Sequence, residues 1–120
     1  MTWSIALGNE FDAEFDELPL AVQDDILALM QLLRTFGPGL GRPHADTLKG
    51  SAYGNMKELR FEADGGAWRV AYAFDPTRRA ILLVGGDKSG GSEKRFYRKL
   101  IAKADMRYGA HLQRLAEDDT

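Results

Sequence analysis

Apolar residues recur along the first third of the chain with two different spacings. Between residues 2 and 7 they alternate with polar ones, the period-2 pattern of a short strand. Over residues 9–18 and 19–36 they recur every three or four positions, which predicts two consecutive helices. Asn9 is a plausible N-cap for the first, and Pro19 suits the first turn of the second. The stripe of the second helix consists of Val22, Ile26, Leu29, Met30 and Leu33.

After an irregular Gly/Pro-rich segment, residues 37–55, the pattern changes to strands. Three runs follow, "NMKELRFEA", "AWRVAYAF" and "AILLVGG", separated by the turn sequences "DGG" and "DPT". The last run is almost entirely apolar, as expected of a strand buried on both faces. From Ser92, which can cap it, a third helix begins. The order predicts an α+β fold, in which a small antiparallel sheet carries an N-terminal helical hairpin and a C-terminal helix.

Composition excludes several kinds of chemistry. The 120 residues fit one domain and contain no cysteine, so disulfides and thiolate metal sites are excluded. The two histidines, His44 and His111, lie far apart and are expected to be structural or exposed, so we expect no metal and no cofactor. Because no apolar run approaches a membrane span, we expect a cytoplasmic protein.

The net charge of -2 conceals an uneven distribution. Residues 1–48 carry eight acids and two bases, whereas residues 49–108 carry 13 bases and seven acids. Residues 109–120 are acidic again, with one base and three acids. This polarity either indicates a face for a polyanion or is a chance distribution over a mixed surface.

Three cations are expected to converge on one face of the sheet. Arg60 and Arg69 occupy non-core positions on the two strands of one hairpin, and Lys88 leaves the end of the next strand. If the hairpin turn is tight, the two arginines are near cross-strand neighbours, an unfavourable arrangement that a bound anion compensates. The alternative is that they form surface salt bridges with Glu58, Glu62 or Asp87.

The loop "GGDKSG" is not a phosphate loop, since Lys88 follows Asp87 rather than a glycine. The helix after it is basic, with Lys94, Arg95 and Arg98 around Tyr97. Basic residues interleaved with an aromatic ring can hold phosphates and stack a base. A solvated helix face is the competing interpretation.

The segments "LKGSAYGNMKELRF", "WRVAYAF", "ILLVGGDKSG" and "FYRKLIAK", in this order, resemble the RelE/ParE superfamily of bacterial toxins. The resemblance is closest to the HigB-type, phage-derived branch of type II toxin–antitoxin systems. It covers residues 1–112 as a single domain and leaves 113–120 as an acidic C-terminal tail.

The resemblance implies a ribosome-dependent mRNA endoribonuclease that needs no metal and uses the ribose 2′-OH as the nucleophile. Arg69 matches the family arginine on the scissile phosphate, and Lys88 matches a basic residue at the end of the last strand. Arg60 would share the phosphate. Tyr97, near the family tyrosine, would act as a base only if Lys94, Arg98 or Lys88 lowered its pKa from about 10. The RNA-binding residues would be Lys49, Lys57, Lys94, Arg95 and Arg98.

The implied partners are the ribosome, mRNA and a cognate antitoxin, expected to be a small helix-turn-helix protein whose complex binds operator DNA. Two alternatives remain from the sequence. The first is a ParE-like inhibitor of DNA gyrase, and the second is a non-catalytic family member that only binds an antitoxin.

Overall fold

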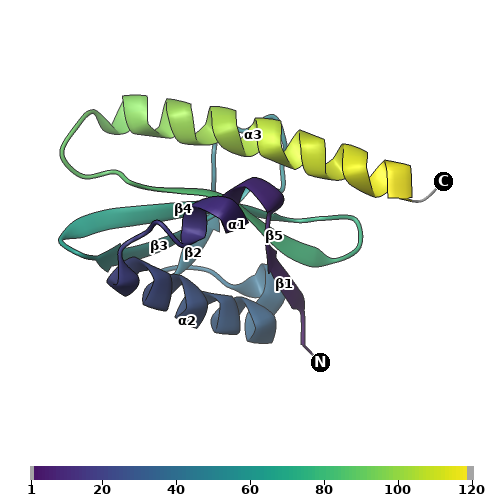
Figure 1. Cartoon of the computed structure of the whole chain (residues 1–120), viewed down its shortest axis with the longest axis horizontal. Helices are drawn as coiled ribbons and strands as arrows, with labels where there is room; N and C mark the ends of the chain where they lie inside the picture. The colour runs from purple at the N-terminus through teal and green to yellow at the C-terminus, as the bar shows by residue number, and fades with distance from the viewer. Residues whose placement is uncertain (1, 119–120) are drawn as a thin grey trace.

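The chain folds into a five-stranded sheet that helices cover on both faces. In the computed structural model, which describes residues 2–118, α3 lies along one face and the α1–α2 hairpin covers the other (Figure 1). The strand order is β1-β5-β4-β3-β2. The elements are β1 (Ser4–Leu7), α1 (Asn9–Phe15), α2 (Leu20–Phe36), the 3-10 turn η1 (Gly37–Gly39), β2 (Ala45–Thr47), β3 (Lys57–Ala63), β4 (Gly66–Phe74), β5 (Arg79–Asp87) and α3 (Glu93–Asp118). The α+β class, the helical hairpin and the C-terminal helix are confirmed.

The sheet is mixed, so the expectation of a purely antiparallel sheet was wrong. β3, β4 and β5 form the predicted antiparallel meander, but β1 pairs with β5 in parallel. The backbone N–H of Gly8 continues this ladder by donating to the Leu82 carbonyl, 2.8 Å away. Alternation along β1 predicts which side chains share a face, but it carries no information about strand direction.

β2 is a strand that the sequence did not predict. Its three residues lie in the Gly/Pro-rich segment and pair antiparallel with β3, with Asp46 directly opposite Glu58. Three residues are too few to show alternation, and the free edge of β3 supplies their hydrogen-bond partners. The pairing brings a carboxylate to the edge of the candidate site.

Two apolar layers sandwich the sheet. Under α2, the predicted residues Val22, Ile26, Leu29 and Leu33 are buried, while Met30 is only partly buried. They pack against the side chains of Leu59, Val70, Tyr72 and Leu82. The layer under α3 is formed by Leu100, Ala104 and Tyr108 with Met56, Ala71, Ala73, Ile81 and Leu83. β5 is buried on both faces between Ala80 and Val84, as predicted.

The helix ends agree with the sequence in one case and differ in two. Ser92 caps α3, because its Oγ accepts the Arg95 N–H at 3.2 Å. The N-cap of α1 is Gly8 and not Asn9, which is already helical. α3 continues to Asp118, so residues 113–118 of the expected tail form its last turns, and 119–120 lie outside the described residues. None of the helices within residues 2–118 has the length and apolar character to cross a membrane.

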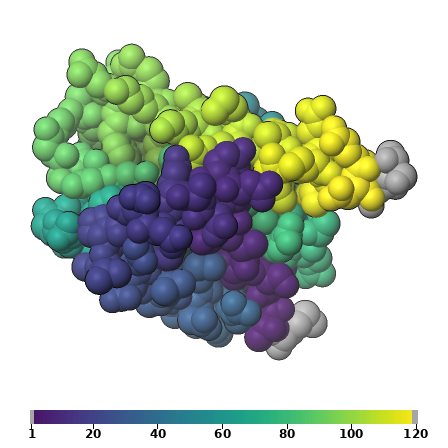
Figure 2. All heavy atoms as spheres, in the orientation of Figure 1, coloured from purple at the N-terminus to yellow at the C-terminus, as the bar shows by residue number. Residues whose placement is uncertain are grey.

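Polar contacts of Arg107 and His111 fasten the C-terminal half of α3 to the rest of the fold. Arg107 donates to both carboxylate oxygens of Glu14 in α1, at 2.7 and 2.8 Å, and to the Leu83 carbonyl at 2.8 Å. Figure 2 shows the N-terminal helix in contact with the middle of α3, where this ion pair lies. One helical turn further on, His111 Nε2 lies 2.8 Å from the buried carboxylate of Asp75. Histidine 111 is therefore structural, as expected.

The Glu14–Arg107 pair predicts a specific pH dependence. The hydrogen bond from Arg107 holds the pKa of Glu14 below its ordinary value. Such a carboxyl stabilises the fold above its unfolded pKa of about 4.3 and loses that contribution as pH falls through the folded pKa. We expect Glu14→Gln to lower the free energy of unfolding at pH 7 by about 1 kcal/mol. Urea unfolding between pH 7 and 3 should also show a weaker acid destabilisation than in the wild type.

The matched control is Glu17→Gln, an exposed carboxylate just after the same helix. It should leave both the stability and its pH dependence unchanged. Identical pH profiles for Glu14→Gln and the wild type would refute this role for the pair.

Candidate functional site

The two arginines predicted to converge are direct cross-strand partners. Arg60 on β3 is paired with Arg69 on β4, and Ala63 with Gly66 closes the hairpin. The turn between them places Asp64 and Gly65 at φ 52° and 76°, the left-handed conformation of a tight two-residue hairpin. Both arginine side chains therefore leave the sheet on the α3 side, next to each other.

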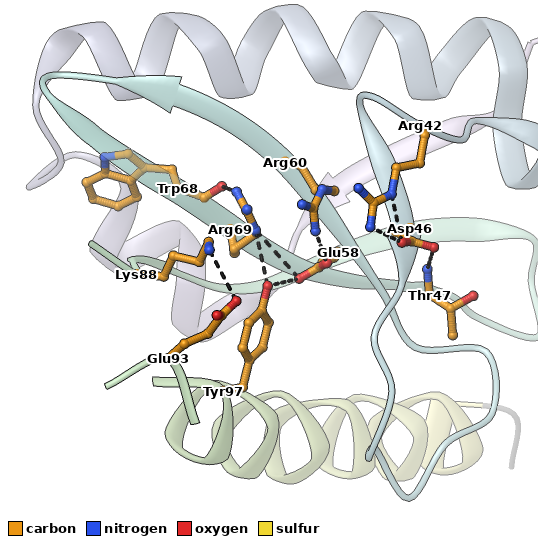
Figure 3. A network of polar contacts seen from close by, with 10 residues as sticks. All are labelled: Arg42, Asp46, Thr47, Glu58, Arg60, Trp68, Arg69, Lys88, Glu93 and Tyr97. Atoms are coloured by element: carbon orange, nitrogen blue, oxygen red, sulfur yellow. Dashed lines mark hydrogen bonds and ion pairs between the residues drawn. The ribbon is translucent and has the colours of Figure 1, made fainter. Parts of the chain in front are cut away.

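Glu58 joins the two arginines into one network (Figure 3). Its Oε2 accepts a hydrogen bond from Arg60 Nη1 at 2.7 Å, and its Oε1 lies 4.0 Å from Arg69 Nε. From α3, Tyr97 donates its hydroxyl proton to Glu58 Oε1 at 2.9 Å and accepts the Arg69 Nε–H at 3.1 Å. Arg69 also donates to the Trp68 carbonyl at 2.8 Å. Three side chains, from β3, β4 and α3, thus converge on one carboxylate.

Sequence reasoning missed this role of Glu58. Glu58 was considered only as a partner in surface salt bridges, whereas it is 4% exposed and Arg69 is 7% exposed. The sequence did contain a sign of burial, because Met56, which directly precedes β3 and packs on the α3 side, is apolar and fully buried. A face that begins with a buried methionine is covered, so its next acid is desolvated and needs partners.

The carboxylate offsets the repulsion between the two arginines. Like charges at paired positions of a hairpin destabilise it, and burial strengthens the effect because water no longer screens them. Glu58 lies between them and compensates part of that charge, while the Arg60 side chain keeps 21% of its surface exposed. Within the network, Arg69 is therefore shielded from solvent, whereas Arg60 is partly accessible to it.

Tyr97 is arranged as a proton donor. Burial raises the pKa of its hydroxyl above the ordinary value, and the hydrogen bond from Arg69 does not reverse the shift. The idea that nearby cations lower this pKa is not supported by the structure. The phenol instead remains protonated through neutral pH and gives its proton to Glu58.

The remaining predicted cations are dispersed around this network. Lys88 lies near Arg69, and its Nζ is 3.2 Å from Glu93 Oε1 (Figure 3). Lys94, Arg95 and Arg98 are exposed on the first turns of α3. Lys57 is not brought into the site, since alternation along β3 turns it to the α2 face, where its Nζ donates to the Pro38 carbonyl at 3.1 Å.

An open pocket of about 250 Å³ lies beside the network. Glu58 and Tyr97 form one side of it, while Asp46, Thr47 and Lys49 form the other, with Arg42 at the rim. Arg42, Asp46 and Thr47 were not predicted as site residues, because they lie in the irregular segment and in β2. Lys49 is the only predicted RNA-binding residue that lines this pocket.

The fold is that of RelE-type proteins. A solved structure of a double arginine-to-alanine mutant of the E. coli toxin RelE, in the free state, superposes with a TM-score of 0.61. The match covers 86% of this chain and 97% of that chain at 10% sequence identity, and it therefore shows the fold alone.

The chain belongs to the family described as "Phage derived protein Gp49-like (DUF891)", whose model matches residues 13–109. In Mycobacterium tuberculosis, the protein named "Putative toxin HigB3" is 48% identical over 82 residues, which is 68% of this chain and 69% of HigB3. The "Putative toxin HigB2" of the same organism is 39% identical over 105 residues, covering 87% of this chain but only 48% of HigB2. The resemblance to the HigB-type, phage-derived branch is confirmed.

From the network we predict that an anion in solution can partly compensate for loss of the Glu58 charge. Glu58→Gln removes the charge that offsets Arg60 and Arg69, so the free energy of unfolding should fall by about 3 kcal/mol. Phosphate should stabilise this variant more than the wild type, because the neighbouring charges of Arg60 and Arg69 then lack a counterion. Thermal unfolding in sodium phosphate and in sodium chloride of equal ionic strength measures the difference.

Glu62→Gln is the control, an exposed acid further along the same strand. It should change stability by less than about 0.5 kcal/mol and show no extra gain from phosphate. Equal phosphate stabilisation of Glu58→Gln and the wild type would mean that the arginines do not form an anion site.

Proposed function

We propose that this chain is the toxin of a type II toxin–antitoxin pair and that it cleaves mRNA on the ribosome. The names of the two mycobacterial relatives support a toxin. The observation that carries the ribonuclease activity is the network of Arg60, Arg69, Glu58 and Tyr97. It combines two cations, a carboxylate and a phenol in one chain of hydrogen bonds, from Arg60 through Glu58 and Tyr97 to Arg69.

These groups match the requirements of cleavage by a ribose 2′-OH. The reaction needs a base for the 2′-OH, cations for the pentavalent phosphorane and an acid for the leaving 5′ oxygen. Arg60, the more exposed arginine, meets the phosphate first, and Arg69 completes its coordination. Glu58 takes the proton of the 2′-OH as the 2′-O–P bond forms. Tyr97 donates its proton to the 5′ oxygen as the P–O5′ bond breaks.

The direct contact between Tyr97 and Glu58 returns the site to its starting state. After one turnover Glu58 is protonated and Tyr97 is deprotonated, and their oxygens lie 2.9 Å apart in the free protein. Transfer of the proton from the carboxyl back to the phenolate restores both groups. The products are a 2′,3′-cyclic phosphate and a 5′-hydroxyl, and no metal enters the balance.

The other cations support RNA binding. Lys88 stabilises charge near the phosphate, once the substrate replaces its exposed partner Glu93. Lys49 and the α3 residues Lys94, Arg95 and Arg98 contact the backbone of mRNA or ribosomal RNA. Lys57 takes no part, because it lies on the other face. The cleavage takes place where ribosomes and mRNA are, in the cytoplasm, and a cognate helix-turn-helix antitoxin holds the toxin inactive.

One observation favours a non-catalytic, antitoxin-binding protein instead. Arg60, Arg69 and Lys88 each lie within 4.0 Å of an acid in the free protein, Glu58 for both arginines and Glu93 for the lysine. In that case the network is a structural clamp between the hairpin and α3. The two functions predict opposite outcomes for the wild type, which cleaves mRNA in the first case and not in the second.

Expression of the wild type is expected to arrest growth and to produce mRNA ends in phase with the codons. Arg69→Ala should lower the cleavage rate by a factor of about 10²–10³, the usual effect of removing one group that stabilises transition-state charge. Glu58→Gln should lower it by about 10²–10⁴, as expected for loss of a general base. Sequencing of mRNA 5′ ends after induction and cleavage assays with purified ribosomes measure these effects.

Arg34→Ala is the matched control, an exposed arginine at the end of α2, and should keep full activity. Growth arrest with intact mRNA and an SOS response would instead establish a gyrase inhibitor. Stable, folded Glu58→Gln that still cleaves at the wild-type rate would exclude Glu58 as the base. A wild type that binds an antitoxin but neither arrests growth nor cleaves would establish the non-catalytic member.

A further inference from the structure

The register of the sheet places two rows of opposite charge next to each other on the α3 side. Arg60 and Arg69 form one row across β3 and β4. Asp46 and Glu58, directly opposite each other on β2 and β3, form the second. The rows are two residues apart along β3, a distance of about 7 Å. A phosphate bound to the arginine row therefore has an acidic, hydrogen-bond-accepting surface beside it. The distance between the rows is similar to that between a phosphate and the nucleoside attached to it.

Arg42 is held at the outer end of the acidic row. Its Nε and Nη2 donate to Asp46 Oδ2 at 3.0 and 2.8 Å, and the Thr47 backbone N–H donates to Asp46 Oδ1 at 2.8 Å. The Thr47 contact, followed by that from Arg42, keeps the pKa of Asp46 below its ordinary value, so the carboxylate stays charged. One edge of the guanidinium is thereby fixed. Within residues 2–118 its Nη1 has no acceptor, and the side chain is 66% exposed.

The pocket between Arg42 and Tyr97 connects this group to the proposed reaction centre. Its volume of about 250 Å³ suffices for one nucleobase. The Tyr97 side chain lines the inner side, and its hydroxyl is bonded to both Arg69 and Glu58. A nucleotide whose phosphate lies on Arg60 can thus place a base between the tyrosine and the Arg42–Asp46 pair (Figure 3).

We propose that Arg42, oriented by Asp46, recognises guanine in the nucleotide next to the scissile phosphate. This inference rests on the ribonuclease function proposed above. Guanine presents two adjacent acceptors, O6 and N7, and a guanidinium can bind both with two parallel hydrogen bonds. The N1–H of guanine, next to O6, then faces an accepting carboxylate. Adenine places an amino donor where guanine has O6, and a guanidinium cannot donate to it.

The test uses ribosomes stalled with an empty A site on mRNAs that differ in a single base of the A-site codon. All four bases are compared at each codon position, because cytosine also offers two adjacent acceptors, N3 and O2. We expect the wild type to cleave the guanine-containing codon about tenfold faster or more at one position. Arg42→Ala should reduce that ratio to near one, while cleavage of the other codons stays within about twofold.

Two further variants separate recognition from general RNA affinity. Arg42→Lys keeps the charge but cannot form two parallel hydrogen bonds, so it should also lose most of the preference. Asp46→Asn frees the guanidinium and should reduce the preference less than Arg42→Ala does. Arg34→Ala should keep the wild-type ratio. Since Arg42 is exposed, circular dichroism should show that its variants are folded.

The outcomes distinguish this inference from the function on which it rests. Cleavage without a base preference, a preference for cytosine, or a guanine preference that survives Arg42→Ala would overturn the guanine subsite and leave the ribonuclease intact. Failure of the wild type to cleave any codon would overturn both. Binding of short RNAs to the wild type gives a second measure, in which replacing guanine by inosine should have little effect because inosine retains O6 and N7.

Discussion

The contact on which the site depends is the sharing of one buried carboxylate by two arginines. Arg60 and Arg69 are forced together by the register of a two-residue hairpin, and their mutual repulsion would weaken that hairpin. Glu58 compensates the charge, and it can do so under α3 only because Tyr97 and Arg60 satisfy its oxygens with hydrogen bonds. The same contacts that keep the hairpin paired therefore gather a carboxylate, two cations and a phenol on one face of the sheet.

The geometry of this cluster is set largely by the long C-terminal helix. Tyr97 lies in the second turn of α3, while the helix is fastened about 15 Å away by the bidentate pair between Arg107 and Glu14. Between them Leu100 and Ala104 of the helix belong to the apolar layer that contains Ala71, Ala73, Ile81 and Leu83 of the sheet. Because a helix moves as a rigid rod, a shift at the anchor displaces the phenol by a comparable distance. The acidic first helix thus has a structural role in the site that its charge alone did not indicate.

The sequence predicted those features that depend on local pattern. Alternation was sufficient to place Arg60 and Arg69 on one face. The turn residues were sufficient to predict that the two arginines are cross-strand neighbours. Ser92 was sufficient to predict the start of α3. The features it could not predict depend on pairing between distant segments. The parallel pairing of β1 with β5 depends on the path that the chain takes through the helical hairpin. β2 forms because the backbone groups at the edge of β3 are available for pairing. The burial of Glu58 requires the position of α3, which no local spacing specifies.

Pairing of the arginines with an acid is compatible with catalysis for a physical reason. In the free protein the oxygens of Glu58 are occupied by the hydrogen bonds from Arg60 and Tyr97. A phosphate carries more negative charge than one carboxylate and competes for the same N–H groups, beginning at the exposed Arg60. If the guanidinium groups turn toward the phosphate, the oxygen of Glu58 that Arg60 occupies becomes free to accept a hydrogen bond from the substrate. In the proposed function, binding of the substrate would thus both position the phosphate and free the carboxylate that faces it.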